Sequence, residues 1–152
     1  MAIGDVVFFD QFLVDVQKKL HDLSSDTLMV GLITAVATPA ATDADPRWGA
    51  GGTTNYLTNE VTPGGNYATG GVAIATPTVT LTAGAAVFDG GDISITQNAS
   101  NPTNARWGII YNSTDTGKRA IGFVDLGAAI DLSAGNFSIT WNASGISSMD
   151  QA

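Results

Sequence analysis

The 152-residue sequence contains no cysteine, one histidine, one glutamate and only six lysines and arginines. Without Cys the chain has no disulfide, no thiolate nucleophile and no cysteine-based zinc or iron–sulfur site. With His21 alone, a histidine metal cluster is excluded. No run approaches the eighteen apolar residues of a membrane span, and segment 1–16 lacks the basic start and cleavage site of a secretory signal. We expect no membrane partner and folding in a cytoplasm.

Positive charge is scarce, and the formal net charge is −8 at pH 7. An acidic chain is repelled by phosphates, which argues against direct nucleic-acid binding. The composition is 44% hydrophobic and 13% charged, which is typical of a folded protein and not of a disordered one. The length predicts a single domain over residues 1–152.

Apolar spacing predicts one amphipathic helix over residues 5–23, with Asp5 as its N-cap. The apolar residues at helical spacing are Phe9, Phe12, Leu13, Val16, Leu20 and Leu23. Val6, Val7 and Phe8 widen this stripe beyond one contact face, which suggests a second surface. His21 falls among polar neighbours and is expected to be exposed.

The rest of the chain predicts a β body over residues 27–142 and a short tail over 143–152. Segment 27–35 is apolar on both faces, as a strand covered on two sides would be. Later segments alternate apolar and polar residues between turn signals. We expect an antiparallel sandwich or barrel-like body of seven or eight short strands, with a core that includes Trp107, Ile109, Phe123, Phe137, Ile139 and Trp141.

A long loop over residues 36–54 interrupts this pattern. Loops of this length in compact domains are usually functional or disordered. Because it carries Arg47 and Trp48, with Tyr56 just beyond, we expect it to contact another protein and Trp48 to anchor that contact.

The sequence shows little sign of reaction chemistry and predicts no catalytic residue, cofactor or metal. Two acidic turns, 43–45 and 89–92, contain carboxylates that suit calcium, but neither has the ligand density of an EF-hand loop. Paired Asp side chains in a pocket would support an enzyme, and an exposed aromatic row including Trp48, Trp107 and Tyr56 would support a carbohydrate-binding module.

Several motifs, in order along the chain, resemble those of small structural proteins of tailed bacteriophages. They are LHDLSSDTLMVGLIT (20–34), NYATGGVAI (66–74), RWGIIYNSTDTGKRAIGFVDLG (106–127) and the Phe-x-Ile-x-Trp strand at 137–141. Trp107 and Gly108 stand where that family usually has a Tyr-Ala pair. The resemblance implies a virion protein without catalytic residues, made in the bacterial cytoplasm.

Within a virion, the acidic charge favours a capsid decoration or cement protein that bridges shell subunits. A tail or adhesin component remains an alternative. The expected partners are the major capsid protein or other virion proteins, and further copies of the chain, with a trimer matching local capsid symmetry. The residues predicted to form protein contacts are Val7, Phe8, Phe12, Arg47, Trp48 and Tyr56. In this interpretation the 106–127 hairpin is a scaffold.

Overall fold

The computed structural model describes residues 5–150 of the chain. It confirms a mainly β protein, with 39% strand, 8% helix, antiparallel sheets and one helix near the N-terminus. Within the described residues, no helix has the length and apolar character needed to cross a bilayer.

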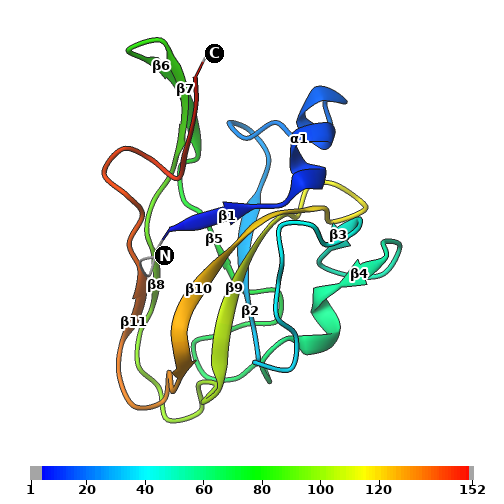
Figure 1. The fold of residues 1–152 in the computed structure, drawn as a ribbon. Helices are drawn as coiled ribbons and strands as arrows, with labels where there is room; N and C mark the ends of the chain where they lie inside the picture. The colour runs from blue at the N-terminus through cyan, green and yellow to red at the C-terminus, as the bar shows by residue number, and fades with distance from the viewer. Residues whose placement is uncertain (1–4, 151–152) are drawn as a thin grey trace.

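A five-stranded antiparallel sheet forms the centre of the molecule (Figure 1). Its longest strands are the two halves of the hairpin at 105–130, and β2 continues the sheet beside β9. The order is β1 (Val6–Phe8), β10 (Ala120–Ile130), β9 (Ala105–Asn112), β2 (Leu28–Ile33) and β5 (Val72–Ala73).

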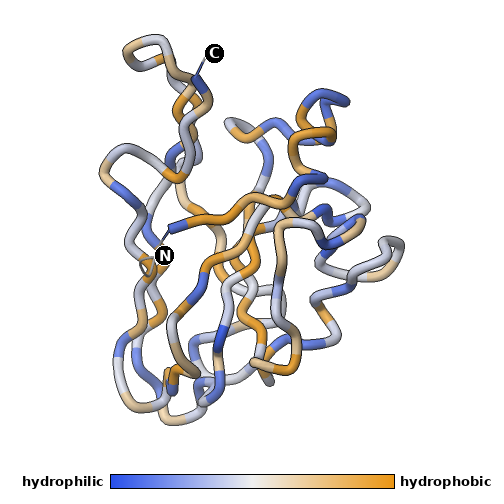
Figure 2. The backbone as a smooth tube through the Cα atoms, in the orientation of Figure 1, coloured by the Kyte–Doolittle hydropathy of each residue, from blue (hydrophilic) through white to orange (hydrophobic). Residues whose placement is uncertain are grey.

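Both faces of this sheet are covered, and hydrophobic segments run along its inner strands and β1 (Figure 2). Alternate residues of β9 serve different cores: Ile110 packs in the larger one, whereas Ile109 and Tyr111 pack in the smaller one. In β2, Val30 and Leu32 pack in the larger core and Ile33 packs in the smaller one, so the prediction that this strand is buried on two sides is confirmed. The predicted core residues are all at most 9% exposed: Trp107, Ile109, Phe123, Phe137, Ile139 and Trp141.

The larger core lies between the sheet and a small second layer. That layer is a two-stranded antiparallel pair, β8 (Ile93–Ile95) with β11 (Phe137–Ile139). Its inward side chains pack with Val30, Leu32 and Val124 of the main sheet. This pairing of layers gives the sandwich-like body.

Three further strands form an arm that projects beyond the body (Figure 1). In spatial order they are β12 (Ser147–Met149), β7 (Ala85–Asp89) and β6 (Thr78–Thr82). β12 falls in the segment predicted as a tail, so its pairing with β7 was not expected. Every residue of β6 is exposed.

The helix is much shorter than the predicted span of 5–23. α1 covers only Asp10–Gln17, and Phe9, not Asp5, is its N-cap residue. Residues 6–8 instead form β1, which pairs with β10 in the register Val6 to Val124. An apolar V-V-F run fits a helix or a strand equally well, and the open edge of β10 decides for the strand.

The long loop at 36–54 crosses the second face of the sheet. It contains β3 (Pro46–Arg47), which pairs in parallel with β4 (Thr54–Asn55), and the 3-10 helix η1 (Tyr56–Asn59) follows. Trp48 and Tyr56 pack with Phe9 in the smaller core. The loop is therefore part of the fold.

Candidate functional site: a polar cluster at the end of the hairpin

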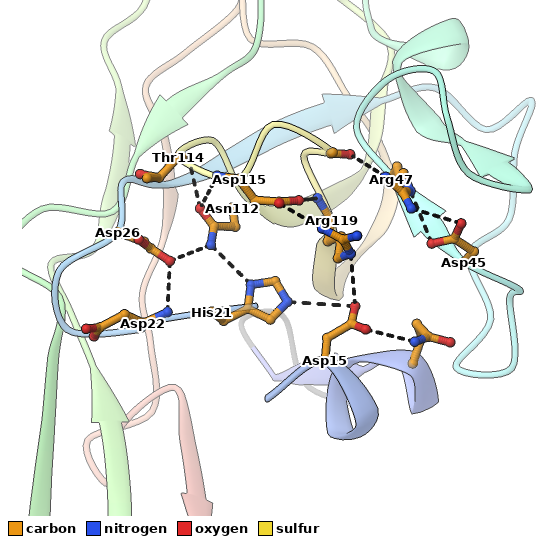
Figure 3. Close-up of polar contacts among 12 residues, drawn as sticks. Asp15, His21, Asp22, Asp26, Asp45, Arg47, Asn112, Thr114, Asp115 and Arg119 are labelled. Carbon is orange, nitrogen blue, oxygen red and sulfur yellow. Dashed lines mark hydrogen bonds and ion pairs between the residues drawn. The ribbon is translucent and has the colours of Figure 1, made fainter. Parts of the chain in front are cut away.

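Charged and polar side chains converge where the β9–β10 hairpin turns (Figure 3). They come from three parts of the chain: α1, the segment between α1 and β2, and the turn itself. The members are Asp15, His21, Asp26, Asn112, Asp115 and Arg119. The cluster therefore connects segments that are far apart in the sequence.

Asn112 lies at the centre of this cluster and is fully buried. Its side-chain Oδ1 accepts hydrogen bonds from the backbone N–H groups of Thr114 and Asp115, at 2.9 and 3.1 Å. Its Nδ2 must then be the donor, and it donates to Asp26 at 2.6 Å. The same nitrogen lies 3.2 Å from Nδ1 of His21.

This arrangement fixes the tautomer of neutral His21. Since Nδ2 of Asn112 can only donate, Nδ1 of His21 must accept, and the proton of the neutral ring sits on Nε2. That Nε2 is buried without a hydrogen-bond partner among the described residues. The nearest carboxylate oxygen, on Asp15, is 4.0 Å away, too far for a hydrogen bond.

Burial lowers the pKa of His21 from its ordinary value. The carboxylates of Asp15, Asp115 and Asp26 oppose this by favouring the charged ring, whereas Arg119 favours the neutral one. The prediction that His21 is exposed is wrong, because its side chain is 0% exposed. The helix ends at Gln17, so helical spacing says nothing about where residue 21 points.

Asp15 is a buried carboxylate, only 3% exposed, on the inner side of α1. It accepts a hydrogen bond from Gln11 at 2.8 Å and lies 3.8 Å from Nε of Arg119. Arg119 also donates to Asp115 at 2.7 Å. One guanidinium thus neutralises acidic groups from both the helix and the turn.

On its other side the turn holds the long loop. The backbone N–H of Trp48 donates to the carbonyl of Lys118 at 2.9 Å. Arg47 pairs with Asp45 at 3.1 Å and reaches the carbonyl of Gly117 at 3.5 Å (Figure 3). The end of the hairpin therefore contacts both α1 and the long loop.

The cluster contains three aspartates, one histidine, one asparagine and one arginine. Its histidine side chain is shielded from solvent, and its ring lies beside Asn112, Asp15 and the ring of Phe12. Among residues 5–150, no group of three or more potential ligands is placed to hold a metal ion. A neighbouring hollow of about 290 Å³, lined by Asp22, Asp26 and Asp115, is shallow and acidic.

The two acidic turns, 43–45 and 89–92, use their carboxylates in contacts within the chain. Asp43 accepts hydrogen bonds from the Tyr56 hydroxyl and from the backbone N–H of Ala40, and Asp45 pairs with Arg47. Asp92 accepts from the backbone N–H of Trp141 at 3.0 Å. These contacts explain the acidic residues as turn-stabilising groups.

The six residues predicted to form protein contacts are dispersed. Trp48, Tyr56 and Phe12 are at most 3% exposed, so they are core residues of this chain. Val7 is half-buried against the smaller core, and Arg47 is half-buried in its ion pair. Phe8 stacks on Phe12, with ring centroids 5.2 Å apart, beside a groove.

That groove lies between α1 and the arm. It consists of two adjoining hollows of about 550 and 350 Å³, which share Met149 of β12. Its apolar lining comes from both sides: Phe8, Phe12, Leu13, Val16, Leu23, Val79, Ile146 and Met149.

Four exposed apolar residues on α1 and β6 were not among the predicted contact residues. On α1 they are Leu13 and Val14, at 57% and 44%, and on β6 they are Val79 and Leu81, at 44% and 81%. The short helix turns Leu13 and Val14 away from the body. The alternation of apolar and polar residues in the later segments, 77–82 among them, predicted one buried face, but β6 extends past the core and all its residues are exposed.

The chain has no match among protein-family models, curated proteins or solved structures.

Proposed function

We propose that this chain is a structural protein of a tailed-bacteriophage particle, acting as a capsid decoration or cement protein. The observation that carries the proposal is the combination of a well-packed β body with exposed apolar residues on the arm and on α1. Leu13, Val14, Val79 and Leu81 offer contact area that a single copy does not bury. The sequence motifs that resemble phage structural proteins point in the same direction.

The polar cluster supports a mechanical function. It holds α1 and the segment before β2 against the hairpin through buried groups, so that the surfaces next to the groove keep their shape. A pre-organised surface loses less entropy when it binds than a flexible one. The hairpin at 105–130 is in this sense the scaffold of the binding surfaces.

As a cement protein, the chain would bury additional interface across neighbouring shell subunits. Standard interfaces bury about 1,600 Å² in total, and many copies acting together multiply a modest affinity. The net charge of −8 fits a position outside the shell, away from the packaged DNA. The partners are the major capsid protein and further copies of this chain.

Heat-induced DNA release tests the proposal. Particles that carry the chain are compared with particles made without it, and release is followed with a DNA-binding dye. The proposal predicts release at a lower temperature when the chain is missing. Equal release temperatures would argue against cementing, and mapping of a labelled chain to the tail would favour the tail alternative.

A further inference from the structure

The arm ends at β6, and within residues 5–150 no strand pairs with the outer edge of β6. β6 pairs with β7 on one side, through the register Thr78 to Asp89 and Thr82 to Ala85, and it ends the spatial order of this sheet. A strand edge presents unpaired backbone donors and acceptors, and proteins usually protect it with charged residues, proline or a bulge. None of these devices interrupts Thr78–Thr82.

The turn type shows which backbone groups face outward. Ala83 and Gly84 form a two-residue turn with φ of 51° and 92°, the geometry of a type I′ hairpin. In such a hairpin Thr82 and Ala85 form a hydrogen-bonded pair, and the pairs alternate from there. The N–H and C=O groups of Val79 and Leu81 therefore point toward the open edge.

The side chains of β6 separate by face. Val79 and Leu81 lie on the side of Phe88 and Ala86, whereas Thr78, Thr80 and Thr82 lie on the opposite side, beside Val87. With Leu81 at 81% exposure and Val79 at 44%, a bare apolar row stands directly next to a bare backbone edge.

We propose that β6 pairs with β6 of a second copy, in antiparallel register about a two-fold axis at Thr80. In this register Val79 of each copy lies opposite Leu81 of the other, and the two pairs exchange four backbone hydrogen bonds. The apolar rows join on one face of a continuous six-stranded sheet. The strand is thus complementary to itself, as a two-fold contact requires.

Charge also favours a second copy as the occupant. Two chains of net charge −8 repel, so they approach best through a surface that carries no charge. No charged residue occurs anywhere from Val61 to Phe88, and β6 lies inside this range. The pair buries less than a standard interface and should form at high concentration.

This inference specifies the self-contact that the proposed function includes, and it predicts a two-fold pair in place of the expected trimer. Its test is made in solution, without particles. A chain that does not dimerise in solution can still bind phage heads through the groove. A chain that dimerises can still fail to bind phage heads. The two failures are therefore distinguishable.

Disulfide trapping tests the register, because the chain has no cysteine of its own. Thr80→Cys places a thiol opposite its own copy in a non-hydrogen-bonded pair, where Cβ atoms are about 4.5 Å apart or closer, near the separation of a disulfide. We expect rapid covalent dimerisation on mild oxidation. Thr78→Cys and Thr82→Cys alone should crosslink slowly, since like positions lie roughly 13 Å apart, but a mixture of the two should crosslink rapidly.

Sedimentation velocity provides the matched control. Leu81→Lys adds charge at the edge and should abolish concentration-dependent dimerisation. Val36→Lys adds the same charge at a loop residue that is 85% exposed, and this variant should still dimerise at high concentration. The proposal is overturned if the three single cysteines crosslink equally, if the mixture does not, or if Leu81→Lys still dimerises.

Discussion

The indole ring of Trp48 occupies the space in which any other residue at position 31 would place its Cβ. A Cβ built on Gly31 would lie 2.3 Å from Cη2 of Trp48 and 2.5 Å from Cζ2. The ring stacks on Tyr111 at a centroid distance of 5.1 Å and an interplanar angle of 7°. A glycine in a central strand and a tryptophan in a long loop thus form one packing unit.

This unit predicts strong coupling between the two positions. Gly31→Ala should destabilise the wild type by about 2 kcal/mol or more, because the added methyl group would overlap a ring that is 1% exposed and stacked on Tyr111. In a Trp48→Leu background the same change should cost less than about 1 kcal/mol. Urea unfolding of the wild type, the two single variants and the double variant gives the coupling energy. Gly135→Ala is the control, because a Cβ added at Gly135 would have no atom within 4 Å.

Truncation of the ring should affect the fold. Trp48→Ala removes a side chain that is 1% exposed and should lower the free energy of unfolding by about 3–5 kcal/mol. This differs from the expectation of an interface anchor, for which the variant would fold normally and assemble poorly. Far-ultraviolet circular dichroism during urea unfolding separates these outcomes, and an unchanged unfolding midpoint would contradict the packing described here.

The buried histidine predicts a pH dependence. Since the pKa of His21 is lower in the folded chain than its ordinary value of about 6.5, the unfolded chain binds the proton more readily. Neutral His21 therefore makes its full contribution to the free energy of unfolding above about pH 6.5. This contribution is lost as the pH falls through the pKa that His21 has in the folded chain. We expect the free energy of unfolding to decrease from about pH 7.5 to about pH 5.5.

The His21→Gln variant isolates this contribution. It should show a flatter profile than the wild type over the same interval, because the carboxylates titrate mainly below about pH 5. Urea unfolding at matched ionic strength measures the difference. Parallel profiles for the two chains would show that His21 does not control the dependence.

The two arginines beside the turn should differ in their contributions. Arg119 neutralises Asp15, which is 3% exposed, so Arg119→Met leaves a buried charge and should cost about 3 kcal/mol. The carboxylate partner of Arg47 is 37% exposed, so Arg47→Met should cost about 1 kcal/mol or less. Equal losses by thermal unfolding would refute the view of Asp15 as the critical buried charge.

The β class and the core of the body could be predicted because they depend on local alternation. Ile109, Phe123 and Ile139 are buried as their strand patterns indicate. β12 could not be predicted, since Ser147–Met149 has no strand pattern and depends on β7 for its pairing. The same holds for β1, which forms only because β10 offers an edge.

The polar cluster was beyond sequence reasoning for a different reason. Its contacts join residues far apart in the chain, such as Asp26 with Asn112, and no spacing rule relates them. For Trp48 a signal was present: Gly31 stands inside an otherwise bulky strand, and such a glycine often marks a close approach by another group. The sequence did not reveal which group that was.

The most direct test of the central proposal is the addition of purified chain to phage heads that lack it. We predict saturable binding at a fixed number of copies per head, together with recovery of the higher DNA-release temperature. Cryo-electron microscopy of the saturated heads should show the chain outside the shell, across contacts between capsid subunits. Failure to bind heads, or binding confined to tails, would contradict the cement function.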